Sequence, residues 1–202
     1  TCAKDSTEDK SSVYITPPSG TSNTTPTVTK YTLSVSFEAD AWNVRGSDPR
    51  ISSVQRLYVA YFNRPADPTS LVSFLDMLPS EPTFEDLLAL AERYFSPSAE
   101  YLVFYSGMSN AAIVNSLYQN LFSRDAEPAG LIHWTGRLEN GQETIATIAL
   151  QLTFSAQGTD AKVIRNKINV ANQFTQGVST TVDYLTGYSG TAAAASARNW
   201  LR

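Results

Sequence analysis

The sequence predicts a mainly α-helical protein in which two tandem helix-turn-helix repeat units form a helical domain behind an N-terminal extended arm with one or two β-strands. Three observations indicate this fold class. Apolar residues recur at spacings of three and four beyond residue 48, a run of residues returns 60 positions later, and apolar and polar residues alternate over 31–37. We therefore divide the chain into an arm, 1–47, and an all-α repeat domain, 48–202.

The arm is extended and polar at its start, because Ser, Thr and Pro dominate residues 1–30. A strand with one apolar face follows, and residues 12–16 are a second, shorter candidate that could pair with it. A lone hairpin is only marginally stable in water, so we expect this apolar face to join or cover another subunit. The apolar residues of this assembly strand are Tyr31, Leu33, Val35 and Phe37.

Cys2 is the single cysteine of the chain, which excludes an internal disulfide and a cysteine-based zinc site. Three alternatives stay open for its thiol: an N-terminal lipid anchor, an intermolecular disulfide, and no modification.

Helices are expected to begin where an acidic residue precedes a proline, because the carboxylate can cap free N–H groups while proline occupies the first turn. Asp48-Pro49, Asp67-Pro68 and Glu127-Pro128 have this arrangement. Apolar stripes at helical spacing follow the first two, and a third stripe runs from Phe84 to Phe95.

The repeat becomes visible when Tyr58 is aligned with Tyr118, a shift of 60 positions. We place the two copies at about 49–108 and 109–175, followed by a C-terminal helical segment, 176–202. The matching residues are Val54, Leu57, Tyr58, Phe62, Arg64, Ala66, Pro68, Leu71 and Leu78 with Val114, Leu117, Tyr118, Phe122, Arg124, Ala126, Pro128, Leu131 and Leu138.

The repeated loops, around Arg64 and Arg124, are expected to be structural. Each arginine can pair with the capping carboxylate or with carbonyls at the preceding helix end, which fixes the angle between the helices. Calcium at Asp125 and Glu127 is only weakly indicated, because the ligand spacing and glycine of a calcium loop are missing, and no cofactor is expected. The loop residues singled out are Arg64, Asp67, Pro68, Arg124, Glu127, Pro128, Gly130 and Trp134.

The second copy, in the segment from Leu117 through Arg124, Glu127-Pro128 and Gly130-Leu131 to Trp134, resembles a domain family of unassigned function found in bacterial S-layer, haemolysin-type and other secreted surface proteins. The first copy departs from the family pattern, with Ser70 and Phe74 in place of the glycine and the tryptophan. The resemblance implies an all-α module on an exported surface protein, and it implies no enzyme.

Composition limits the partners. The 15 Lys and Arg residues do not balance the 19 Asp and Glu residues, and they form no cluster, so nucleic acid is not an expected partner. No apolar run reaches the roughly 18 residues of a membrane span. The low charged fraction of 17% and the abundant Ser and Thr favour an extracellular or cell-surface location.

The favoured function is therefore structural: a secreted, non-catalytic subunit that self-assembles through its arm into an extracellular filament, tube or S-layer-like lattice. The alternative is a non-catalytic surface module that binds lipopolysaccharide or another glycan. An enzyme is not expected, because His133 is the only histidine and neither a nucleophile motif nor a metal-binding motif accompanies it.

Overall fold

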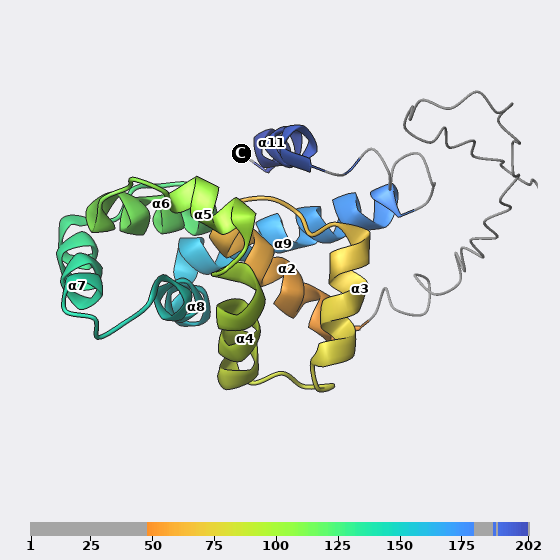
Figure 1. The fold of residues 1–202 in the computed structure, drawn as a ribbon, viewed down its shortest axis with the longest axis horizontal. Helices are drawn as coiled ribbons and strands as arrows, with labels where there is room; N and C mark the ends of the chain where they lie inside the picture. Colours follow the sequence, from red (N-terminus) through yellow and green to blue (C-terminus); the bar gives the residue numbers. More distant parts are fainter. Residues whose placement is uncertain (1–47, 180–187, 189, 202) are drawn as a thin grey trace, which may run out of the picture. The chain divides into compact units, whose positions relative to one another are not determined.

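The structure is a computed structural model that describes residues 48–179, 188 and 190–201, and this part of the chain is mainly helical and contains no strand (Figure 1). The predicted arm, its assembly strand and Cys2 lie outside the described residues, as does part of the predicted C-terminal segment. In chain order the described elements are α2 (Pro49–Phe62), α3 (Pro68–Met77), α4 (Phe84–Leu90), the π-helix η1 (Ala91–Phe95), α5 (Ala99–Tyr105), α6 (Asn110–Phe122), α7 (Pro128–Glu139), α8 (Ile145–Ser155), α9 (Gly158–Val178) and α11 (Gly190–Trp200).

Three helices begin at the predicted acidic-proline pairs. The Asp48 and Asp67 carboxylates accept from the N–H groups of Arg50 and Ser70, so both are N-caps. Glu127 was expected to cap in the same way, but its side chain makes no capping hydrogen bond. Its longer side chain pairs with Arg124 instead.

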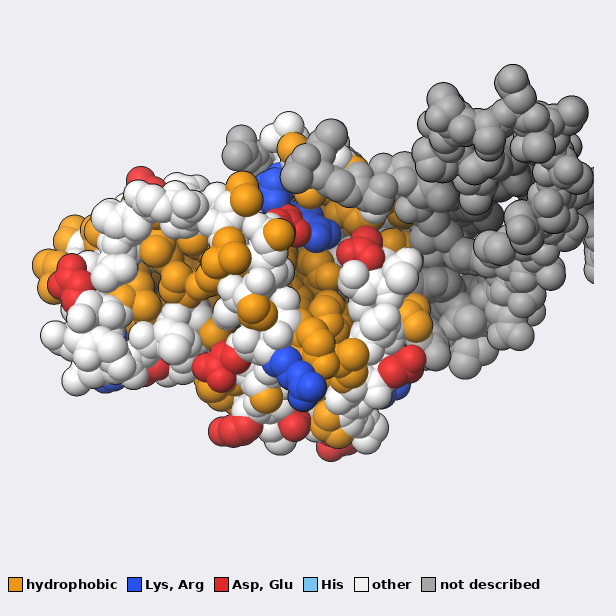
Figure 2. Space-filling model, viewed as in Figure 1, with side chains coloured by type: hydrophobic (Ala, Val, Ile, Leu, Met, Phe, Trp, Pro, Cys, Tyr) orange, Lys and Arg blue, Asp and Glu red, His pale blue; other side chains and the backbone are white. Residues whose placement is uncertain are grey.

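α2 is the centre of the core and packs against α9, α6, α3 and α8. The sequence predicted one apolar stripe on this helix, yet Val59 and Ala60, which lie outside that stripe, are fully buried as well. The second half of α2, from Leu57 to Phe62, is buried all round and has no solvent face to keep polar, which explains the difference. Figure 2 shows apolar side chains in the space between α3 and α4, over α2.

The two sequence copies fold alike over more than a helix-turn-helix unit. α2, α3, α4 with η1, and α5 correspond to α6, α7, α8 and the first turns of α9. Both first helices end in a residue with left-handed backbone, Asn63 at φ 48 and Ser123 at φ 56. A side-chain carboxamide of each first helix, from Gln55 or Asn115, accepts from the backbone N–H of an alanine 11 positions later. The repeating unit is therefore a group of four helices.

α7 is more exposed than α3, its counterpart in the first copy. Leu71 and Leu75 of α3 are buried, whereas α7 has no buried residue and packs chiefly against α6. In copy one, Phe95 of η1 fills the space beside α3 and stacks on Phe62 at 5.6 Å between ring centroids. The equivalent position in copy two is the exposed Ser155, so no ring closes that side of α7.

Candidate functional site

Arg64, singled out in the sequence, is held in an arrangement that we call clasp 1, formed by Tyr58, Phe62, Arg64 and Glu100. The Arg64 Nε and Nη2 atoms donate to the two Glu100 carboxylate oxygens at 2.9 and 2.7 Å. Nη1 donates to the Pro65 carbonyl at 2.9 Å, and the guanidinium lies 4.8 Å from the centre of the Tyr58 ring. The bidentate pair ties the end of α2 to the first turn of α5.

Clasp 2, formed by Tyr118, Phe122, Arg124 and Asp160, repeats this geometry. Arg124 Nε and Nη2 donate to the Asp160 oxygens at 3.1 and 2.6 Å, and Nη1 donates to the Asp125 carbonyl at 3.0 Å. The guanidinium lies 5.2 Å from the centre of the Tyr118 ring. In both clasps the carboxylate stands 36 positions after the arginine, so the pair belongs to the repeated unit.

The partner of each arginine differs in part from the prediction. Arg64 was expected to pair with the capping carboxylate Asp67 or with carbonyls at the preceding helix end, but Asp67 caps α3 and Arg64 pairs with Glu100. Arg124 does pair with Glu127, at 2.9 Å, and also with Asp160. The sequence pattern located both arginines and missed Glu100 and Asp160, because these carboxylates lie beyond the loop in which the partner was sought.

The clasps differ most in how far water reaches them. The Arg64 side chain is 11% exposed and that of Arg124 is 42% exposed. Clasp 1 is covered by the C-terminal part of the chain, where Tyr188 Oη donates to the Pro65 carbonyl at 2.8 Å. Arg198 of α11 donates to Glu100 and, through Nε at 2.9 Å, to the Phe62 carbonyl.

Gly130 fits the longer carboxylate of the second copy. A Cβ atom at this position would lie 2.6 Å from a Glu127 carboxylate oxygen and 2.7 Å from the Tyr118 hydroxyl. Copy one has Ser70 at this place, together with Asp67, whose side chain is one methylene shorter than that of Glu127. Copy one thus combines Asp67 with Ser70, and copy two combines Glu127 with Gly130.

Gly130→Ser is expected to lower the free energy of unfolding by about 1 kcal/mol, because crowding at Glu127 outweighs the gain in helix propensity. The double variant Gly130→Ser with Glu127→Asp recreates the pair of copy one and should recover most of that loss. Urea unfolding of the two variants and the parent chain measures the effect. A double variant as unstable as Gly130→Ser would contradict this explanation.

His133 and Trp134 lie together on α7, with ring centroids 4.7 Å apart, and His133 is exposed.

Within residues 48–179 and the described C-terminal residues, no three His, Cys, Asp or Glu side chains are placed to hold a metal ion. No helix of this part is long and apolar enough to cross a membrane.

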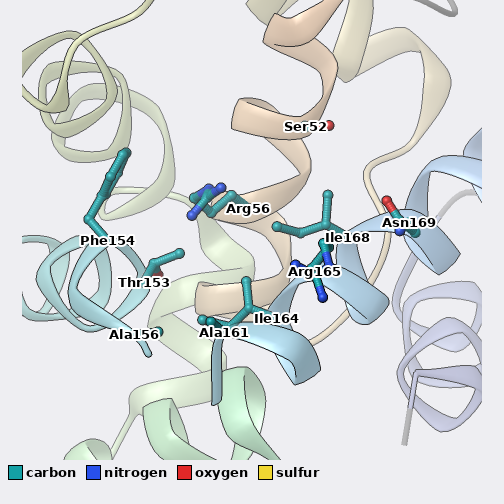
Figure 3. Close-up of a pocket in the computed structure, with 10 residues that line it drawn as sticks. All are labelled: Ser52, Arg56, Thr153, Phe154, Ala156, Ala161, Ile164, Arg165, Ile168 and Asn169. Carbon is teal, nitrogen blue, oxygen red and sulfur yellow. The ribbon is translucent and has the colours of Figure 1, made fainter. Parts of the chain in front are cut away.

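An open pocket of about 370 Å³ lies between α2, α8 and α9 (Figure 3). Arg56 reaches it from α2, Phe154 from α8 and Arg165 from α9, while Ile164 and Ile168 form part of its wall. The Arg56 guanidinium lies 5.1 Å from the centre of the Phe154 ring. The pocket therefore combines two cationic groups with apolar and aromatic surface.

Neither arginine has an acidic partner among the described residues. Arg56 is partly buried, and burial lowers the pKa of its guanidinium below the ordinary value. Arg165 is exposed. A guanidinium that is removed from water without a counter-charge is costly, and a bound anion would compensate that cost. The pocket is consequently suited to a carboxylate or phosphate group.

The sequence does not predict this pocket, since Arg56 and Arg165 belong to no shared motif. The one local signal is Arg56 itself, a cation in a helix whose other residues from Val54 to Phe62 are all buried. None of the loop residues singled out in the sequence lines the pocket.

A family model described as a domain of unknown function (DUF4214) matches residues 91–159, about a third of the chain. The match runs from η1 through α8 and covers most of the second copy, including clasp 2 apart from Asp160. No curated protein and no solved structure matches the chain.

Proposed function

We propose that the helical region is a non-catalytic binding module of an exported bacterial surface protein, and that it holds the acidic group of a surface glycan in the pocket of Arg56 and Arg165. The observation that carries the proposal is the pair of guanidinium groups at one pocket, neither with an acidic partner in the described residues. A carboxylate or phosphate accepts charge-assisted hydrogen bonds from such groups.

The aromatic surface beside the arginines favours a sugar acid over a simple inorganic ion. Phe154 is 51% exposed, and its ring lies 5.1 Å from the Arg56 guanidinium. An apolar ring next to a cation suits a ligand with a carbon skeleton and one acidic group. The resemblance to modules of secreted surface proteins agrees with a glycan ligand. Self-assembly through the strand at 31–37 stays a prediction, because that strand lies outside the described residues.

Calorimetric titration of the full chain at low salt tests the proposal, with an oligomer of a hexuronic acid and the matching neutral oligosaccharide. We expect binding of the acidic oligomer alone. Arg56→Gln and Arg165→Gln should each weaken it about tenfold, because each removes one charge-assisted interaction.

Arg93→Gln is the matched control, since it removes an exposed arginine on η1, away from the pocket. It should leave the affinity unchanged. Equal binding of the acidic and neutral oligomers, or equal weakening by all three substitutions, would contradict a site at this pocket.

A further inference from the structure

The two clasps differ in whether a second arginine contacts them. In clasp 1, Arg198 supplies a second guanidinium, which bonds both the carboxylate of Glu100 and the Phe62 carbonyl at the end of α2. The counterparts in clasp 2 are Asp160 and the Phe122 carbonyl. Among the described residues, no second cation reaches either of them.

The charges around the two clasps differ accordingly. Around clasp 1, the two cations Arg64 and Arg198 pair with one carboxylate, Glu100. Around clasp 2, Arg124 alone pairs with two carboxylates, Glu127 and Asp160, which are exposed or half-buried. A third carboxylate, that of the neighbouring Asp125, is exposed and accepts a hydrogen bond from the neutral Gln119 side chain. Clasp 2 therefore carries an excess of negative charge at the place where clasp 1 receives an arginine.

We propose that clasp 2 is a docking site for an arginine side chain on a helix of a partner protein, which would contact Asp160 as Arg198 contacts Glu100. The contact differs from that of α11 in one respect. Val59, fully buried in a cluster with Leu201 of the C-terminal segment, has the exposed Gln119 as its counterpart in copy two. The partner is thus recognised by its positive charge more than by apolar area. This inference is independent of the pocket at Arg56 and Arg165.

A peptide with the sequence of residues 190–201 is a suitable probe, because it carries Arg198 in the helix that makes this contact within the chain. The peptide is titrated into the isotope-labelled full chain at low salt, and backbone amide shifts are followed by NMR. We expect shifts at Asp125, Glu127 and Asp160. A peptide with Arg198→Gln should bind about tenfold more weakly, because it lacks the charge-assisted hydrogen bonds.

Asp125→Asn and Glu127→Gln each remove a negative charge at clasp 2 while Asp160 still holds Arg124. Both substitutions should lower the affinity for the peptide. Glu139→Gln, an exposed acid at the end of α7, is the matched control and should not. Equal binding of the two peptides, the absence of binding, or shifts confined to Val59 and Glu100 would overturn the proposal. The last outcome would mean that the peptide only displaces α11.

Discussion

Replacing Arg64 by methionine is expected to lower the free energy of unfolding by about 3 kcal/mol, because it breaks a largely buried, bidentate ion pair. Without Arg64, Glu100 keeps only Arg198, and the Pro65 carbonyl keeps only Tyr188. The tie between the end of α2 and the start of α5 is lost at the same time. Urea unfolding followed by circular dichroism measures the change.

Arg124→Met is the matched control, since it removes the same atoms from the same geometry in copy two. Its ion pairs are open to water, so the expected cost is below about 1 kcal/mol and should shrink further with added salt. Equal losses for Arg64→Met and Arg124→Met would contradict the claim that burial under the C-terminal segment distinguishes the clasps.

The second large effect is expected at Gln55, which is fully buried and joins three elements. Its amide oxygen accepts from the Ala66 N–H at 2.9 Å, and its amide nitrogen donates to Thr175 Oγ1 at 2.7 Å. Thr175 closes the network by donating to the Ala66 carbonyl at 2.7 Å. Gln55→Met keeps the side-chain volume but leaves the buried Ala66 N–H without an acceptor. The free energy of unfolding should therefore fall by about 2–3 kcal/mol.

Asn115→Leu is the corresponding change in copy two, where Asn115 accepts from the Ala126 N–H at 3.0 Å in a half-buried position. Water can reach the Ala126 N–H when the Asn115 amide is removed. The free energy of unfolding is therefore expected to fall by about 1 kcal/mol or less. Thermal unfolding of the two variants gives the comparison. A loss at Gln55 as small as that at Asn115 would show that the buried network contributes little.

The helical class of the described region and the helix starts at three prolines were predictable from local chemistry. A capping carboxylate and a proline act within one turn, so the sequence pattern around Asp67 contains the whole interaction. Glu127 shows the limit of that pattern, because one added methylene was enough to turn its carboxylate toward Arg124.

The clasps were predictable only in part and the pocket was not predicted, since both depend on residues far apart in the chain. The repeat singled out Arg64 and Arg124, but Glu100 lies 36 positions after Arg64 and Arg198 comes from the last helix. The pocket is likewise lined by residues of α2, α8 and α9, which are distant in the sequence and share no short motif. The same 60-residue shift applied to acidic residues would have paired Glu100 with Asp160, a signal that was present in the sequence.

NMR of the arginine side chains distinguishes whether Arg56 and Arg165 together bind an acidic group. The Nε–H resonances of the full chain are recorded while an oligomer of a hexuronic acid is added at low salt. We expect the resonances of Arg56 and Arg165 to shift together, while those of Arg64 and Arg124, held by their carboxylates, stay in place. Unmoved Arg56 and Arg165 resonances, or a uniform shift of every exposed arginine, would contradict it.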